Sequence, residues 1–162
     1  MGDRGRSRPR SFDGRRSSSP SRRPPRSASS LVTRSVRGTE AAGARLARTL
    51  VAGDCVCLIG PLGAGKTAFV RGALRALGVR RPAASPTFVL AREGSGRVPV
   101  AHLDFYRLRV RAEERGLLDY LDGRHVVFVE WADRDPSFWP GNAIVVVIEP
   151  VGPARRRLRI WS

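Results

Sequence analysis

A phosphate-loop pattern, Gly-x-x-x-x-Gly-Lys-Ser/Thr, at residues 60–67 is the sequence feature that most constrains the fold. The preceding residues 55–59 read Cys-Val-Cys-Leu-Ile, the short apolar run typical of a strand buried on both faces. After the pattern, Gly78 supplies a residue that ends helices, and apolar residues recur at helical spacing at Val70, Ala73, Leu74 and Leu77. The sequence therefore predicts a strand, a glycine-rich loop and a helix in that order.

This loop is predicted to bind phosphate groups. Its glycines allow crowded or left-handed backbone conformations, so that amide N–H groups turn inward at the positive end of the helix. We expect Lys66, the only lysine of the chain, to reach the outer phosphates, and the Thr67 hydroxyl to ligate Mg²⁺. The predicted nucleotide-binding residues of the loop and the first helical turn are Gly60, Leu62, Gly63, Ala64, Gly65, Lys66, Thr67 and Ala68.

Length and composition predict one domain behind a basic tail. The chain has 162 residues, 41% of them hydrophobic, which suffices for a single core. Residues 1–30 hold nine arginines, two aspartates and almost no apolar side chain, so we expect a disordered tail before a P-loop domain at residues 31–162. The net charge of +16 divides into +7 on this tail and +9 on the domain. This excess could attract nucleic acid or an acidic protein, or it could simply form a solvated basic face.

Neither a membrane span nor a secretory signal is recognisable in the sequence, so we predict a cytoplasmic protein without membrane contact. The two cysteines, Cys55 and Cys57, lie two positions apart in the predicted buried strand. This spacing favours packing in a reducing compartment over a disulfide or a metal site.

The remaining pattern predicts an α/β fold of the P-loop nucleotide-hydrolase type. We expect an edge strand over residues 31–36 and a helix from its N-cap Thr39 to Leu50, with a buried stripe at Ala42, Leu46 and Leu50. A hairpin follows, with strands at 85–92 and 98–103 around a turn at 93–96, and closing strands are expected at 143–149 and 155–160. The predicted architecture is a three-layer sandwich with a mostly parallel central sheet, an antiparallel hairpin and antiparallel closing strands.

Within the hairpin, Thr87 in Ser-Pro-Thr-Phe has two interpretations. Its hydroxyl could sense the terminal phosphate, as switch segments of nucleotide hydrolases do, or the stretch could be a simple turn that opens a strand.

Carboxylates end two apolar strands. Asp104 follows the run to residue 103, and Glu130 follows residues 125–129, His-Val-Val-Phe-Val. A carboxylate at the tip of a buried strand is the arrangement that holds a metal-bound water beside a phosphate loop. We predict that Thr67, Glu130 and Asp104 serve the metal, with Lys66, Glu130 and Asp104 as the catalytic set. The two carboxylates compete for the hydrolytic role. Glu130 is favoured because its strand is the better buried one, and Asp104 is assigned a second metal-side or switch position. His102 and His125 are assigned no ligand role, because no cysteine or second histidine has a suitable spacing.

Four motifs in this order resemble the TsaE family: the loop at 60–67, Ser-Pro-Thr-Phe at 85–88, His-x-Asp-x-Tyr-Arg at 102–107, and Glu130-Trp131. The resemblance covers residues 31–162. It implies a small bacterial P-loop ATPase that uses ATP and Mg²⁺ and acts with TsaB and TsaD homologues. Their product would be the threonylcarbamoyl group on adenosine in tRNAs that read codons beginning with A, so tRNA contact would come through the complex.

By the same resemblance, Trp131 lies next to the nucleotide site. Arg134, three residues later, is also predicted to bind the nucleotide. Two positions depart from the family pattern, Pro61 where an acidic residue is common and Phe105 where an aliphatic one is usual.

Two other functions fit parts of the sequence. A small-molecule kinase shares the loop but needs an acceptor pocket and an arginine-bearing lid, for which we find no segment. A nucleotide-holding RNA-binding module would use Arg155, Arg156 and Arg157 as its surface, yet aromatic residues do not alternate with them there. Because Lys66 is the sole lysine, the lysine-containing guanine-recognition motif is excluded, and ATP is preferred over GTP.

Overall fold

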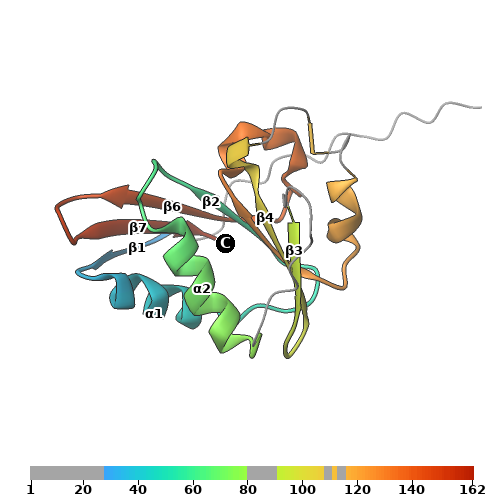
Figure 1. Ribbon diagram of the computed structural model, residues 1–162, viewed down its shortest axis with the longest axis horizontal. Coiled ribbons are helices and arrows are strands. Elements are labelled where there is room, and N and C mark those ends of the chain that lie inside the picture. Colours follow the sequence, from blue (N-terminus) through green and yellow to red (C-terminus); the bar gives the residue numbers. More distant parts are fainter. Residues whose placement is uncertain (1–27, 80–90, 108–110, 113–115) are drawn as a thin grey trace, which may run out of the picture.

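The computed structural model describes residues 28–79, 91–107, 111–112 and 116–162. These residues form one seven-stranded sheet in the order β1-β7-β6-β2-β5-β4-β3 (Figure 1). The strands are β1 (Ala28–Thr33), β2 (Cys55–Ile59), β3 (Ala91–Ser95), β4 (Pro99–Asp104), β5 (Val126–Glu130), β6 (Ile144–Pro150) and β7 (Arg156–Trp161).

The centre of the sheet is parallel. Strand β2 pairs with β5 on one side and β6 on the other, and β4 pairs with β5, all in parallel. Outside them, β3 runs antiparallel to β4, while β7 runs antiparallel to both β6 and β1. The predicted fold class, with its hairpin and closing strands, is therefore confirmed.

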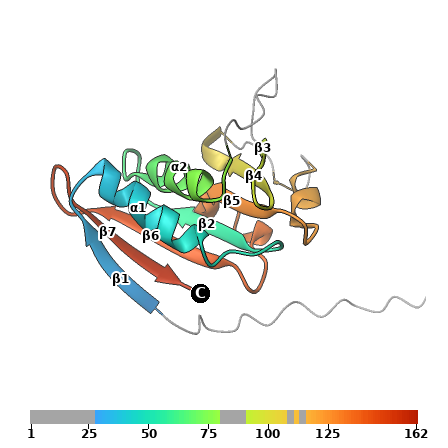
Figure 2. The ribbon, with the colours of Figure 1, turned by 90° about the horizontal axis from the view of Figure 1, so that it is seen from below.

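Both α-helices of the described residues cover the same face of the sheet (Figure 2). They are α1 (Val36–Ala47) and α2 (Lys66–Ala76). The core on this face packs helix residues such as Phe69 of α2 against alternate residues of the strands, among them Val56, Leu58, Phe128 and Leu158. Burial of these apolar side chains supplies the main stabilisation of the layer.

The opposite face carries short 3₁₀ helices, η1 (Phe105–Arg107), η3 (Leu117–Leu121), η4 (Ala132–Arg134) and η5 (Pro136–Phe138). Phe105 and Phe138 meet there edge to face, with ring centroids 5.2 Å apart. Cys55 and Cys57 point into this second core as buried free thiols, which agrees with the predicted packing role. No helix in the described part of the chain is long and apolar enough to cross a membrane.

The first helix begins earlier than predicted. Its N-cap is Ser35, whose hydroxyl accepts the N–H of Gly38 at 3.0 Å. Thr39 instead lies inside the helix, where its buried hydroxyl bonds that of Thr33 at 2.9 Å. The helix also ends at Ala47, so Leu50 is buried from the following turn and not from the helix. The predicted N-cap Thr39 was wrong because two serine or threonine residues compete for that position in the sequence.

The hairpin turn also lies later than the predicted residues 93–96, since β3 continues to Ser95. Tertiary contacts explain the shift: Arg97 donates its backbone N–H to Leu77 at 2.7 Å and its guanidinium to the carbonyls of Ala47 and Leu50, both at 3.0 Å. The turn thus satisfies carbonyl groups at the ends of both helices. Residues 85–90, with Thr87, lie outside the described residues, so its two interpretations stay open.

Strand β1 begins at Ala28, inside the predicted tail, and Ala28 to Ser30 pair with Trp161 to Arg159 of β7. Residues 1–27 of that tail lie outside the described residues. The closing strands β6 and β7 agree with their predicted bounds to within one residue.

Helices α1 and α2 approach each other at reciprocal glycines. A Cβ on Gly43 of α1 would clash with the carbonyl group of Phe69, and a Cβ on Gly72 of α2 would clash with the carbonyl group of Glu40. Because backbone atoms are the obstacle, no side-chain rotation relieves either clash. The helix pair therefore requires glycine at both crossing points, and α2 carries the phosphate loop at its N-terminus.

We predict that Gly43→Ala lowers the free energy of unfolding by about 1–3 kcal/mol, since the added methyl must push the helices apart. Gly38→Ala on the same helix is the matched control. The nearest atom to its added Cβ, Cβ of Thr33, would lie at 3.3 Å, and alanine raises helix propensity, so a change below about 1 kcal/mol is expected. Urea unfolding measures both values, and equal stability of the two variants would contradict the close approach.

Candidate nucleotide-binding site

The phosphate loop joins the carboxyl end of β2 to the N-terminus of α2. Gly60, Gly63 and Gly65 have positive φ angles of 153°, 73° and 107°. Residues with a Cβ rarely adopt such angles. Gly60 is further required because a Cβ there would collide with the carbonyl of Ile148 in the neighbouring strand β6. The predicted loop glycines are thus placed as the pattern indicates, at a helix end suited to anions.

Lys66 folds back over its own loop. Its ammonium donates to the carbonyl oxygens of Gly60 at 2.6 Å and Pro61 at 2.9 Å, and it lies 3.5 Å from the ring centroid of Trp131. The residue is only 4% exposed. Burial lowers the pKa of this ammonium, while the charges of Glu130, Asp133 and Asp104 act in the opposite direction. The sole lysine is therefore held at the mouth of the loop by neutral and aromatic partners.

Thr67 and Glu130 meet although they are 63 residues apart in sequence. The Thr67 hydroxyl donates to Oε2 of Glu130 at 2.8 Å. Glu130 is 3% exposed, ends strand β5, and stands beside Leu58 of β2 in the parallel register. A hydroxyl and a carboxylate are the oxygen ligands that Mg²⁺ prefers. This pair fits the predicted metal role of both residues.

The second oxygen of Glu130 is occupied by His102, a residue that the sequence analysis left without a role. Nε2 of His102 lies 2.9 Å from Oε1 of Glu130. Because a carboxylate oxygen only accepts, the imidazole nitrogen carries the proton in this contact. The available signal was the position of His102 two residues before Asp104, on the same face of β4, since alternate strand residues share a face.

Asp104 is next to this group but does not touch it. Its Cα is paired with that of Glu130 between β4 and β5. The side chain, however, is exposed, and its Oδ1 accepts the backbone N–H of Tyr106 at 2.9 Å. The structure thus brings Lys66, Thr67 and Glu130 together and leaves Asp104 at the rim. Among the described residues, no group of three or more His, Cys, Asp or Glu side chains is arranged to hold a metal ion.

An aromatic and cationic cluster forms the rim beside Lys66. The rings of Tyr106 and Trp131 lie 5.0 Å apart, and the Arg134 guanidinium stands 5.1 Å from the first and 5.6 Å from the second. Trp131 has a φ of 57°, the only positive value among the described residues other than glycine. Such a conformation costs about 1–3 kcal/mol and persists where the surroundings enforce it. Trp131 therefore lies beside Lys66, and Arg134 lies beside Trp131. That both residues contact the nucleotide stays a prediction.

Arg156 is a further residue whose role the sequence analysis missed. Its guanidinium contacts the carbonyl oxygens of Ala64 and Gly63 in the phosphate loop, at 3.0 and 3.4 Å. The sequence held one signal for this contact. Arg156 lies two residues before Leu158 on the same strand, so both share the face that packs under the helices, where Leu158 is buried. In the RNA-binding alternative, Arg155, Arg156 and Arg157 would form the binding surface, but Arg156 contacts the phosphate loop instead.

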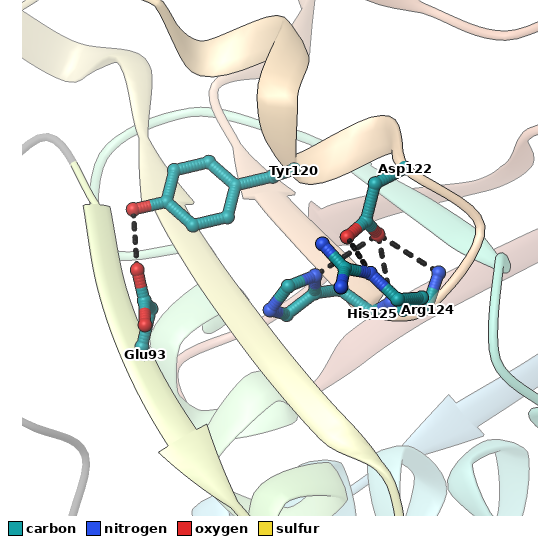
Figure 3. A network of polar contacts seen from close by, with 5 residues as sticks. All are labelled: Glu93, Tyr120, Asp122, Arg124 and His125. Carbon is teal, nitrogen blue, oxygen red and sulfur yellow. Dashed lines mark hydrogen bonds and ion pairs between the residues drawn. The ribbon is translucent and has the colours of Figure 1, made fainter.

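A separate polar network lies at the other end of β5 (Figure 3). Asp122 accepts from the side chains of His125 and Arg124, at 3.0 and 2.7 Å, and Tyr120 donates to Glu93 at 2.8 Å. The hydrogen bond from His125, followed by that from the Arg124 backbone, holds the pKa of Asp122 well below its usual range. Asp122 also accepts the backbone N–H groups of Arg124 and His125, so these contacts close the turn before β5.

Comparisons with known proteins agree with this geometry. The sequence model of the family described as "Threonylcarbamoyl adenosine biosynthesis protein TsaE" matches residues 33–158. The tRNA threonylcarbamoyladenosine biosynthesis protein TsaE of Bacillus subtilis (strain 168) is 38% identical over 107 residues, which cover 65% of this chain and 68% of the relative. The protein of the same name from Mycobacterium leprae (strain TN) is 41% identical over 143 residues, which cover 82% and 89%.

The solved structure titled as the crystal structure of Bacillus subtilis YdiB superposes with a TM-score of 0.71 at 30% identity. The match covers 83% of this chain and 84% of that one. A family match over residues 33–158, with the phosphate loop and the Thr67–Glu130 contact inside it, leads to one conclusion. This chain belongs to the TsaE family.

Proposed function

We propose that this protein is a Mg²⁺-dependent ATPase that acts in the formation of threonylcarbamoyladenosine in tRNA. The observation that carries the proposal is the meeting of Lys66, Thr67 and Glu130 at one phosphate loop. A cation, a hydroxyl and a carboxylate in these positions are the parts that phosphoryl-transfer enzymes of the P-loop class use. The family membership supplies the pathway, because the relatives carry the biosynthetic name.

Phosphate binding would exchange the partners of Lys66. Its ammonium now satisfies two carbonyl oxygens, and the lowered pKa reflects an incompletely compensated burial. A phosphate oxygen offers a charged acceptor, which forms a stronger hydrogen bond than a neutral carbonyl. We therefore infer that Lys66 leaves Gly60 and Pro61 when nucleotide binds, while the loop amides and the end of α2 hold the phosphates.

The metal would be held by Thr67 and Glu130, whose oxygens already lie 2.8 Å apart. When bound, Mg²⁺ neutralises the charge that develops on the phosphates during transfer. Glu130 would orient the attacking water, and His102 would hold the carboxylate in position through its Nε2. Asp104 lies at the rim, and its charge acts on Lys66 by raising the pKa of the ammonium. It would serve on the metal side or couple a neighbouring segment to the metal.

The rim of Tyr106, Trp131 and Arg134 would contact the nucleotide beyond its phosphates. Aromatic faces and a guanidinium are suited to a purine ring and to phosphate charge. Our proposal includes TsaB and TsaD homologues as partners, tRNA contact through that complex, slow turnover without them, and a cytoplasmic location. No described residue favours the kinase alternative, and the RNA-binding alternative is weakened by the inward position of Arg156.

The first test separates the two carboxylates. Glu130→Gln should still bind ATP but lose hydrolysis by about 10²–10⁴-fold, because the amide keeps size and hydrogen bonding without the charge. Asp104→Asn should weaken the Mg²⁺ dependence together with turnover. Single-turnover rates and titrations with a fluorescent ATP analogue measure both effects. Normal hydrolysis by Glu130→Gln, with binding but no turnover by Asp104→Asn, would reverse the two roles.

The second test measures the contact between His102 and Glu130. A double-mutant cycle with His102→Ala and Glu130→Ala should give a coupling energy of about 0.5–3 kcal/mol, because the pair is nearly buried. Arg159 and Glu149 form the control pair, with side chains 45% and 38% exposed, for which a coupling close to zero is expected. Urea unfolding supplies all the energies. Equal coupling in both pairs would remove the basis for a positioning role of His102.

The third test is an ATPase assay with and without TsaB and TsaD homologues. We expect slow turnover by the protein alone and a higher rate with the partners present. Lys66→Met is the control, since it keeps the buried stem and removes the charge, and it should abolish turnover in both conditions. Circular dichroism confirms that the variant is folded. Unchanged hydrolysis by folded Lys66→Met would overturn the assignment of this loop.

A further inference from the structure

We propose that Arg156 is a positioning residue for the phosphate loop and sets its affinity for nucleotide phosphates. The inference rests on the proposed function of the loop and extends it to a side chain on the far strand β7. Arg156 lies 92 residues from Ala64 in sequence, yet its Nε donates to the Ala64 carbonyl at 3.0 Å. The second loop contact runs from its terminal nitrogen to the Gly63 carbonyl at 3.4 Å.

The guanidinium itself is anchored by the turn between β6 and β7. It donates to the carbonyl oxygens of Gly152, Pro153 and Arg155, at 3.2, 3.4 and 2.9 Å. A planar fork with five N–H donors can serve both sets of acceptors at once, which a lysine ammonium cannot do with the same geometry. Arg156 therefore ties the phosphate loop to a hairpin of the sheet.

These contacts fix two successive peptide planes of the loop. In a trans peptide the carbonyl and the next N–H point in opposite directions, and the described residues contain only trans bonds. The Gly63 carbonyl faces Arg156, while the following N–H of Ala64 donates to Pro61 at 3.1 Å. The Ala64 carbonyl also faces Arg156, so the N–H of Gly65 is directed to the opposite side of the loop.

That opposite side is where we place the phosphates. Fixing the Gly65 amide before binding lowers the conformational cost of forming the cradle. A carbonyl that accepts from a cation is also polarised, which makes the N–H of the same peptide group a stronger donor. Each partner of Arg156 named above is a neutral carbonyl, so its positive charge remains beside the loop and adds to the attraction for phosphate.

The test compares Arg156→Ala with Arg157→Ala. Arg157 is the matched control because it is the next arginine on β7 and is exposed. Calorimetric titration of ADP, well below the melting temperature, should give a Kd raised about tenfold or more for Arg156→Ala and unchanged for Arg157→Ala. In the steady state the KM for ATP should rise more than kcat falls, the reverse of the pattern expected for Glu130→Gln.

Arg156→Lys keeps the charge and most of the stem, and it decides the matter if Arg156→Ala does not fold. We expect it to have the melting temperature of the wild type and an intermediate Kd for ADP, because an ammonium cannot bridge both carbonyls. A wild-type Kd in folded Arg156→Lys, or equal Kd values for the two alanine variants, would overturn the proposal. The proposal would also be overturned if the loss of ADP binding in each variant matched the fraction of protein that is unfolded.

The wild-type measurements keep this proposal separate from the proposed function. A wild-type protein that binds ADP but never hydrolyses ATP would contradict the ATPase and leave the positioning role intact. A wild-type protein that binds neither ADP nor ATP would overturn both.

Discussion

The parallel pairing of β2 with β5 is the constraint on which the site depends. In parallel strands the carboxyl ends meet at the same edge of the sheet, so the segment after Ile59 and the end of β5 emerge side by side. One strand supplies the phosphate loop and the other supplies Glu130. The Thr67–Glu130 hydrogen bond is a consequence of this register. A shift of one residue would turn Glu130 into the opposite core, among the 3₁₀ helices.

Two cations share the carbonyl groups of the loop. Lys66 binds the oxygens of Gly60 and Pro61, and Arg156 binds those of Gly63 and Ala64. Their surroundings differ. The lysine is close to the carboxylate of Glu130 and to Trp131, whereas the arginine is fastened to a turn of the sheet. In our proposal the lysine changes partners when nucleotide binds, and the arginine keeps the loop in shape.

The packing of α1 against α2 positions the end of the phosphate loop. Gly43 and Gly72 allow α1 and α2 to touch through their backbones, and Arg97 joins the hairpin turn to the ends of both helices. These contacts connect β3, on one edge of the sheet, with the helix that starts at Lys66. The N-terminus of α2, which faces the proposed phosphates, is therefore positioned by packing along the whole helix, from Phe69 in its first turn to Leu77 at its other end.

The sequence by itself determined the loop, its flanking strand and helix, and the two strand ends that carry Asp104 and Glu130, because fixed spacings and apolar runs encode local conformation. It also indicated the family. Only the tertiary structure decided that Glu130 touches Thr67 while Asp104 turns to the Tyr106 backbone. The same holds for His102 and Arg156, and for Ser35 in place of Thr39 as the helix cap. These outcomes depend on which distant side chains and backbone groups compete for one partner, and periodicity within a segment carries no information about that competition.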